Sequence, residues 1–265
     1  MKKIRFEEML PDELLRLQKE EKPVYMPVGS MEWHSLHLGM GVDTIHAEGV
    51  AVKLAEKLGG AVFPPLYIGT ESIRTPDSLK RLGFQGNEEI RGMDFPENSI
   101  KSCYWPPEMF EMIISQQVKM LLDMGFHRIV ILNGHGAAVQ KKILQRICEK
   151  YSGEENKLLS VMVLLPDCGA QLGHAGLAET ALMQALRPEA VNLEKLPQKP
   201  ERLLYKTYGI ADAGGHETEH FVHYDPRDAT SKLGYEMLLC ETEKCEKLIR
   251  EVFEIEDGKE HADLG

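Results

Sequence analysis

Long apolar runs and an excess of positive charge are both missing from this chain of 265 residues. No stretch of 18 or more apolar residues occurs, and the first residues lack the apolar core of a signal peptide, so neither a membrane helix nor export is expected. Lysine and arginine total 31 against 42 aspartates and glutamates, and the net charge of −11 argues against nucleic acid or an anionic membrane as partner. We therefore expect a cytoplasmic protein.

Cysteine is scarce as well. The five cysteines are odd in number and no two have CxxC spacing, which predicts free thiols rather than a disulfide framework. Cys168 lies in a loop beside a glycine, where we expect a small buried apolar residue rather than a nucleophile. A hydrophobic fraction of 43% is enough for one sizeable core, so a single domain over residues 1–265 is expected.

Apolar strand patterns alternate with helical patterns along most of the chain. The strands expected are residues 24–28, 61–63, 129–132 and 158–165. The helices expected are residues 44–58, 107–124, 138–151, 177–186 and 229–255. This alternation predicts an α/β fold, with a mostly parallel sheet flanked by helices on both faces. Residues 69–106 look irregular, and so long a loop inside a compact domain is usually functional.

Acidic and histidine side chains follow three of the expected strands. They are Glu32, His34, His37 and Asp43 after the first strand, His135 after residues 129–132, and His174 and Glu179 after residues 158–165. Sites in open parallel sheets form beyond the carboxyl ends of the strands, so these side chains are expected at one edge of the sheet. His46, three residues past Asp43, is expected on the surface of a helix.

Oxygen and nitrogen ligands without a thiolate suit Zn²⁺, Mn²⁺ or Fe²⁺ at open catalytic positions. Asp43 could bridge two such ions through its two oxygens, and the ion sites could be completed by Glu32, His34, His135 and Glu179. Two ions about 3.5–4 Å apart can share a hydroxide and polarise a carbonyl. The cluster therefore predicts hydrolytic chemistry at two divalent metal ions.

Three short motifs carry these residues. Residues 32–39 read Glu-Trp-His-Ser-Leu-His-Leu-Gly and precede Asp43, residues 133–136 read Asn-Gly-His-Gly, and residues 174–180 read His-Ala-Gly-Leu-Ala-Glu-Thr. In this order and spacing the chain resembles the creatininase (creatinine amidohydrolase) family, with a weaker match at residues 224–230. The chain departs from the family's pattern at Ser35, Gly39, Val42 and Ala138, which puts the geometry of the substrate pocket in question more than metal binding.

The resemblance implies an α/β/α sandwich, commonly assembled as a hexamer, that uses two metal ions to hydrolyse the C–N bond of a small cyclic or linear amide. Carried over by position, Glu32 and His135 would bind one ion, His34 and Glu179 the other, and Asp43 both. A metal-activated hydroxide would attack the carbonyl, and His174 would protonate the departing nitrogen, with Glu179 beside it as the second catalytic residue. His37 would orient a ligand or the water.

Creatinine itself is not the expected substrate. Creatininase carries tryptophans between its second and third motifs, whereas residues 139–173 contain none and the only tryptophans here are Trp33 and Trp105. Loop 69–106, with Arg74, Arg81, Arg91 and the pair Tyr104-Trp105, is expected to shape a different pocket.

The sequence leaves two alternatives open. His216, Glu217 and His220 spell the HExxH of a zinc peptidase, which works only on a helix; the preceding Gly214-Gly215 favours a solvated or pocket-edge loop instead. A member of the family that binds metal without turnover is the non-enzymatic alternative.

Overall fold

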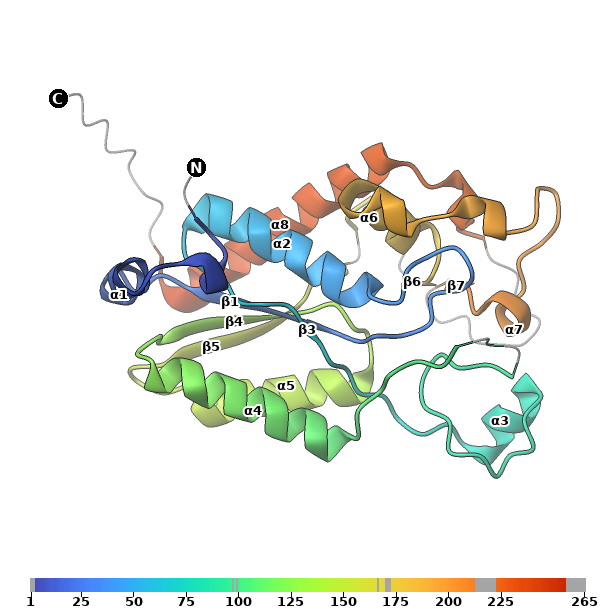
Figure 1. Cartoon of the computed structure of the whole chain (residues 1–265), viewed down its shortest axis with the longest axis horizontal. Coiled ribbons are helices and arrows are strands. Elements are labelled where there is room, and N and C mark those ends of the chain that lie inside the picture. The colour runs from blue at the N-terminus through green and yellow to red at the C-terminus, as the bar shows by residue number, and fades with distance from the viewer. Residues whose placement is uncertain are drawn as a thin grey trace.

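The structure is a computed structural model that describes residues 3–96, 98, 100–165, 167–169, 173–212 and 223–255. Its centre is a parallel sheet with strand order β2-β1-β4-β5, in which β3 pairs with the far end of β1 (Figure 1). The strands are β1 (Val24–Gly29), β2 (Ala61–Val62), β3 (Leu66–Tyr67), β4 (Arg128–Asn133) and β5 (Lys157–Met162). A separate antiparallel pair is formed by β6 (Gly173–His174) and β7 (Ala211–Asp212).

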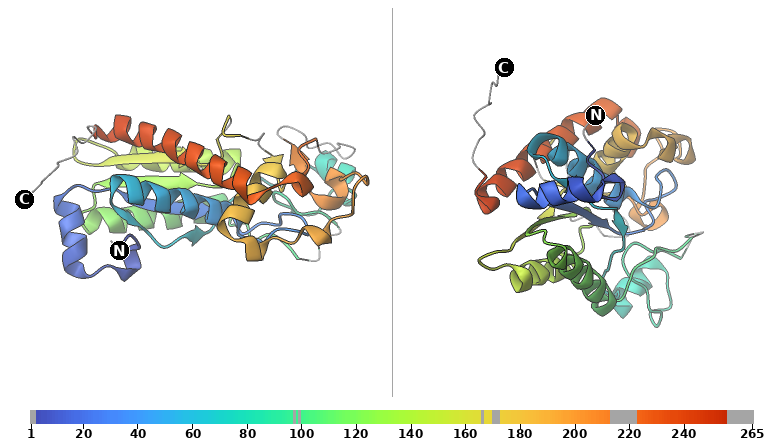
Figure 2. Two further views of the ribbon diagram at one scale, coloured as in Figure 1. Left: turned by 90° about the horizontal axis from the view of Figure 1, so that it is seen from above. Right: turned by 60° about the vertical axis from the view of Figure 1, so that its left-hand side comes forward.

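Helices cover both faces of the sheet, which confirms the predicted fold class (Figures 1 and 2). One face is covered by α2 (Val42–Leu58), α6 (Leu177–Leu186) and α8 (Ser231–Phe253), and the other by α4 (Pro107–Asp123) and α5 (Ala138–Tyr151). The shorter helices lie at the two ends of the sheet and are α1 (Pro11–Lys19), α3 (Pro76–Leu82) and α7 (Tyr205–Tyr208).

The apolar strands divide their side chains between two cores. Tyr25 and Val130 enter the core on the α2 and α8 side, whereas their neighbours Val24 and Ile129 enter the core on the α4 and α5 side. All four side chains have no exposed surface. Because both faces of β1 and β4 are buried, their sequences read as continuous apolar runs rather than as an alternating pattern.

The irregular segment 69–106 contains one helix that the sequence pattern did not predict. In α3 the side chain of Thr75 accepts a hydrogen bond from the backbone N–H of Ser78 at 3.3 Å, Pro76 occupies the first turn, and Gly83 ends the helix at φ +99°. These are ordinary helix start and stop signals. With only 7 residues, the helix is too short to show an apolar period.

Two expectations about single residues are wrong. His46 is not on the surface but 3% exposed, because α8 covers that side of α2 and places Glu241 against it. Cys168 is not a free thiol: it forms a disulfide with Cys240, 72 residues away, across Cα atoms 5.5 Å apart. The loop after β5 lies on α8, a contact that cysteine spacing in the sequence cannot reveal.

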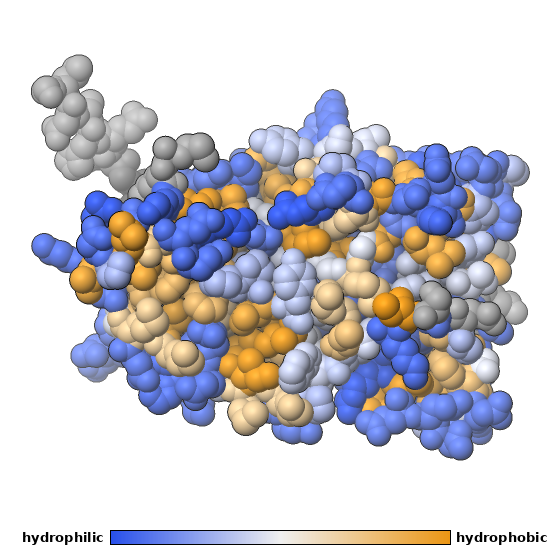
Figure 3. Space-filling view, in the orientation of Figure 1, coloured by the Kyte–Doolittle hydropathy of each residue, from blue (hydrophilic) through white to orange (hydrophobic). Residues whose placement is uncertain are grey.

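Apolar and polar side chains are interspersed on the face seen in Figure 3. Helix α4 contributes several exposed apolar side chains, Met109, Met112 and Met120. Among the described residues, none of the helices combines the length and apolar character that crossing a bilayer requires.

Candidate metal centre

The first group of candidate ligands is placed by the end of β1 and the start of α2. Glu32 and His34 lie in the connecting loop, which is closed by a hydrogen bond from the backbone N–H of Glu32 to the carbonyl of Met40 at 3.0 Å. Asp43 lies in the first turn of α2 and accepts hydrogen bonds from Ser30, at 2.5 Å from Oγ and 3.3 Å from the backbone N–H. The three candidate ligands are all buried.

Two glycines allow the start of α2 to lie directly on the strand ends. A Cβ atom on Gly29, at the end of β1, would lie 2.6 Å from the Cβ of Asp43. A Cβ atom on Gly134, just after β4, would lie 1.9 Å from the carbonyl oxygen of Asp43. Any larger residue at either position would push Asp43 away from the loops that carry the other ligands.

His135 is held by an amide network at the end of β4. The side chain of Asn133 accepts a hydrogen bond from the backbone N–H of His135 at 3.1 Å and donates to its carbonyl at 2.9 Å. The side chain of Gln140 donates to Asn133 at 2.8 Å and accepts from the backbone N–H of Thr70 at 2.9 Å. The His135 loop is thereby fixed to α5 and to the loop after β3.

His174 and Glu179 come from β6 and from the first turn of α6. Oε2 of Glu179 accepts a hydrogen bond from the backbone N–H of Ala175 at 2.5 Å. Nε2 of His174 donates to the carbonyl of Trp33 at 2.9 Å, and its Nδ1 lies 3.1 Å from Oε1 of Glu32. The rings of His174 and His34 lie 4.4 Å apart between centroids, so the third motif meets the first directly.

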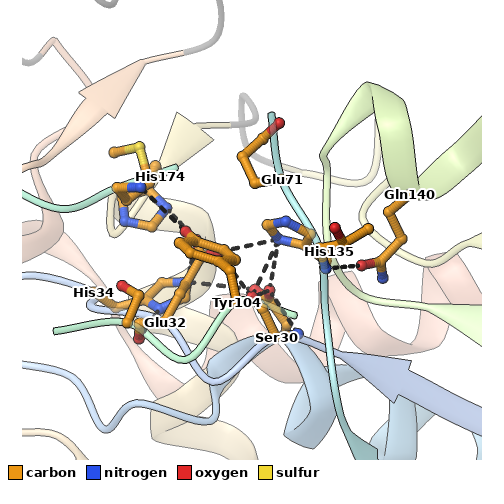
Figure 4. Close-up of polar contacts among 12 residues, drawn as sticks. Ser30, Glu32, His34, Glu71, Tyr104, His135, Gln140 and His174 are labelled. Atoms are coloured by element: carbon orange, nitrogen blue, oxygen red, sulfur yellow. Dashed lines mark hydrogen bonds and ion pairs between the residues drawn. The ribbon is translucent and has the colours of Figure 1, made fainter. Parts of the chain in front are cut away.

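The five predicted ligands form two groups that share Asp43 (Figure 4 shows Glu32, His34 and His135). Oδ1 of Asp43 lies 3.3 Å from Nε2 of His34, while Oδ2 lies 3.0 Å from Nδ1 of His135. Glu32 completes the His135 group at 3.1 Å from Nδ1, and Glu179 completes the His34 group at 3.7 Å from Nε2. Each oxygen of one aspartate thus faces a different histidine.

Glu32, His34 and His174 form a third group whose potential ligand atoms also lie close enough to share an ion. The sequence predicted His174 as an acid, not as a ligand. Because Nε2 of His174 is occupied as a donor to a carbonyl, Nδ1 is the nitrogen left to hold a proton or an ion against Glu32.

The hydrogen bonds of the histidines fit a cation. Nδ1 of His34 donates to the backbone carbonyl of Glu32 at 3.1 Å, which leaves the lone pair on Nε2. That nitrogen is buried and has no hydrogen-bond partner among the described residues, yet it faces three carboxylates, those of Asp43, Glu179 and Glu32. A backbone-fixed imidazole that aims its free nitrogen at carboxylates is the usual arrangement of a histidine metal ligand. The donor set, oxygen and nitrogen without sulfur, suits a divalent ion at an open site.

Charge compensation dominates the pKa values of the centre. Burial alone would lower the pKa of His34, but the carboxylates of Glu179, Asp43 and Glu32 outweigh it and raise the pKa to about 10. Burial is likewise outweighed at His135, whose pKa is raised well above its usual range by Glu32 and Asp43. Burial and Glu32 would raise the pKa of Asp43, but His135 and His34 lower it to about 2. Buried carboxylates here require positive charge, carried by protons or by metal ions.

His37, predicted to orient a ligand or the water, contacts the centre only indirectly. Its Nε2 lies 2.9 Å from the hydroxyl of Thr180, the residue after Glu179. Burial, together with His34 and His174, lowers the pKa of His37 to about 3, so this ring is neutral. His37 therefore supports the start of α6.

Two functional neighbours were not predicted from the sequence as parts of the site. Oγ of Ser30 lies within hydrogen-bond distance of three candidate ligands, at 2.7 Å from Glu32, 2.5 Å from Asp43 and 3.2 Å from His135. Its position directly after β1 could have pointed to it. The hydroxyl of Tyr104 donates to Glu32 at 2.8 Å, and no local signal in the sequence indicates this contact.

Two of the three arginines in loop 69–106, Arg74 and Arg91, make hydrogen bonds within the loop. Arg74 donates to the carbonyl of Gly92 at 2.6 Å, and Arg91 donates to the carbonyl of Glu71 at 3.1 Å. The HExxH residues 216–220 lie outside the described residues.

A parallel sheet whose strand ends place buried carboxylates and imidazoles around one point defines a class of α/β proteins that bind divalent metal. The chain belongs to the creatininase (creatinine amidohydrolase) family, whose model matches residues 7–95 and 97–249. Members of that family are metal-dependent amidohydrolases acting on C–N amide bonds, and this chain is an enzyme of that class.

Two relatives and several solved structures are similar to the chain. Creatinine amidohydrolase of Pseudomonas putida is 25% identical over 194 residues, covering 66% of this chain and 68% of the relative. Mycofactocin precursor peptide peptidase of Mycolicibacterium smegmatis is 27% identical over 179 residues, covering 65% of this chain and 61% of the relative. The crystal structure of creatinine amidohydrolase has a TM-score of 0.67 at 20% identity, covering 95% of this chain and 98% of that one. Solved creatininases in a manganese form and a zinc–zinc form are similar in fold, with TM-scores of 0.66 and 0.67.

Proposed function

We propose that the chain hydrolyses the C–N bond of an amide at two divalent metal ions. Glu32, Asp43 and His135 would hold one ion, and His34, Asp43 and Glu179 the other. The observation that carries the proposal is the Asp43 carboxylate, whose two oxygens face His34 and His135 at 3.3 Å and 3.0 Å. When bound, two such ions lower the pKa of a water between them and polarise the carbonyl under attack.

The protein's own contribution to the proposed reaction is a proton for the departing nitrogen. An amine leaves an amide poorly unless it is protonated, and His174 is the candidate donor. Its ring is held by the carbonyl of Trp33 at Nε2, so a proton on Nδ1 lies against Oε1 of Glu32 at 3.1 Å. The side chain is 11% exposed, against 0% for His34, which leaves it open to a bound substrate.

Glu179 is proposed both as a ligand and as the second catalytic residue. Its pKa is raised above the usual value, because burial and the Asp43 carboxylate outweigh the lowering effect of His34, His174 and the N–H of Ala175. The N–H of Ala175 donates to Oε2 of Glu179, the oxygen that also faces Nε2 of His34, and so holds that oxygen in place.

Two relatives indicate the class of bond that the proposed substrate contains. The two curated relatives are named for a cyclic amide and for a peptide, so they share an amide C–N bond. We propose a small cyclic or linear amide other than creatinine, since residues 139–173 provide no tryptophan. The peptidase relative makes a short peptide the second candidate.

Metal analysis followed by hydrolysis assays tests this proposal. The purified chain should bind about two Zn²⁺ or Mn²⁺ ions, Asp43→Ala should lose both, and hydrolysis of a panel of lactams, formamides, hydantoin-like rings and short peptides should require them. His174→Ala should keep the ions and lose turnover, whereas a loss of an ion would identify His174 as a ligand instead. Bound metal with no hydrolysis across the panel would favour the non-catalytic alternative.

One variant pair separates the HExxH alternative from the proposed centre. His135→Ala should weaken metal binding and His216→Ala should not; the opposite result would identify the HExxH segment as the metal site. A cytoplasmic location, a single domain over residues 1–265 and the hexamer implied by the family resemblance stay predictions, and light scattering of the purified chain tests the last.

A further inference from the structure

Tyr104 reaches the candidate centre from near the end of loop 69–106. The backbone on either side of it is pinned by neighbouring segments: the N–H of Cys103 donates to the carbonyl of Met31 at 2.7 Å, and the N–H of Trp105 donates to the carbonyl of Gly69 at 2.8 Å. The loop therefore lies as an added extended segment between the Glu32 loop and the segment after β3. Figure 4 shows the Tyr104 ring among Glu32, Ser30 and His135.

The hydroxyl of Tyr104 is fixed from two directions. It donates to Oε2 of Glu32 at 2.8 Å and accepts a hydrogen bond from the backbone N–H of Met93 at 3.1 Å. Gly92 makes room for it: a Cβ atom there would lie 2.3 Å from both Cζ and the hydroxyl oxygen of Tyr104. Because the backbone N–H of Met93 already donates to the hydroxyl oxygen of Tyr104, the hydroxyl proton is directed at the Glu32 carboxylate.

The other donors to Glu32 are shared or are needed elsewhere. Oγ of Ser30 has one proton and lies 2.7 Å from Glu32 but 2.5 Å from Asp43. The facing nitrogens of His135 and His174 can hydrogen-bond to Glu32 only while they carry protons. A histidine nitrogen that binds an ion no longer donates, so ion binding removes that support from Glu32.

We infer that Tyr104 is a positioning residue that holds the Glu32 carboxylate in the orientation required to bind the ion it shares with Asp43 and His135. The inference rests on the proposed function, because it presupposes an ion at that group. Tyr104 acts through Glu32, and no hydrogen bond, ion pair or ring contact among the described residues joins it to His34 or Glu179. Its effect should therefore be selective for one of the two ion sites.

The test measures Zn²⁺ affinity by chelator competition in two backgrounds, each of which retains one complete ion site. In Glu179→Ala, where the His135 group is intact, adding Tyr104→Phe should weaken Zn²⁺ binding by about 10- to 100-fold. In His135→Ala, where the His34 group is intact, Tyr104→Phe should change the affinity by no more than about twofold. Phenylalanine keeps the ring, so the packing of the loop is retained.

Tyr205→Phe is the matched control, because its hydroxyl contacts Met93 and Arg74 in the same loop. It should leave the affinity unchanged in both backgrounds. Gly92→Ala, which displaces the Tyr104 ring but keeps its hydroxyl, should reproduce the selective loss and provides a second test if Tyr104→Phe folds poorly.

Equal Zn²⁺ affinity with and without Tyr104→Phe in the Glu179→Ala background would overturn the inference. Equal weakening in both backgrounds would also overturn it, since that result assigns Tyr104 a general role in loop packing. A wild-type chain that binds no Zn²⁺ would instead refute the proposed metal centre itself. The three results can be told apart because the wild-type titration is performed first.

Discussion

Binding of metal ions to the candidate centre should release protons, chiefly from His34 and His135. The pKa of His34 is raised to about 10 by Glu179, Asp43 and Glu32 against the effect of burial, so at pH 8 this ring is mostly charged in the ion-free protein. His135 is raised well above its usual range for the same reason. A histidine must be neutral to bind an ion, so filling both sites at pH 8 should release about two protons from these rings, in addition to any proton lost by a water between the ions.

Titration calorimetry with Mn²⁺ measures this number. The observed enthalpy should vary linearly with the ionisation enthalpy of the buffer, with a slope of at least about two protons per chain. His34→Asn should reduce the slope by about one proton. His37→Asn is the control: its pKa of about 3 leaves that ring neutral, so it contributes no proton.

The raised pKa of His34 also predicts how the stability of the ion-free protein changes with pH. Because the folded pKa of His34 lies above its unfolded value of 6.5, its charge stabilises the fold fully below that value. The stabilisation is lost as pH rises toward about 10, so the thermal midpoint should fall over this range unless ions are present. A proton slope near zero at pH 8 would refute the argument, since it would show that the carboxylates are not compensated by protonated His34 and His135.

Two substitutions at residues that are not themselves candidate ligands test the packing of the centre. His46→Ala leaves the Glu241 carboxylate buried without the imidazole now 2.5 Å away, and should lower the free energy of unfolding in urea by about 3–5 kcal/mol. Gly134→Ala places a Cβ atom 1.9 Å from the carbonyl oxygen of Asp43, and should lower both bound metal by elemental analysis and stability, by about 1–3 kcal/mol.

Each has a control in the same region. Lys57→Ala breaks an exposed ion pair between the same two helices, α2 and α8, and should cost no more than about 1 kcal/mol. Gly136→Ala lies two residues from Gly134, but nothing within 4 Å would meet its Cβ atom, so metal content should be unchanged. If His46→Ala destabilises the protein no more than Lys57→Ala does, the buried ion pair is not the cause of the loss of stability. If Gly134→Ala and Gly136→Ala have the same effect on metal content, close packing of Gly134 on Asp43 is not the cause.

The elements that position the site were predictable because they are regular and apolar. The pattern of residues 129–132 predicts a strand, and β4 extends it by one residue at each end. Helix 138–151 agrees with α5 at both ends. Ligands that follow such strands are delivered to one edge by the topology of a parallel sheet, which is why His34 and His135 could be expected together.

Contacts that depend on irregular backbone could not be predicted in the same way. Tyr104 reaches Glu32 across 72 residues of chain, guided by hydrogen bonds of the neighbouring backbone groups. The Cys168–Cys240 pair also spans 72 residues and joins a loop to a helix. His46 has the local pattern of a surface residue, and only the path of α8 buries it. In each case the deciding partner belongs to a segment whose position no local pattern specifies.

Several of the groups that hydrogen-bond to the candidate ligands are neutral. The Tyr104 hydroxyl donates to Glu32, the side-chain amide of Asn133 donates to the carbonyl of His135, and the backbone N–H of Ala175 donates to Glu179. A neutral donor keeps its hydrogen bond whether the neighbouring charge is a proton or a metal ion. The exchange of protons for ions can therefore occur without rebuilding the loops, and the geometry of the centre is set by the fold before any ion arrives.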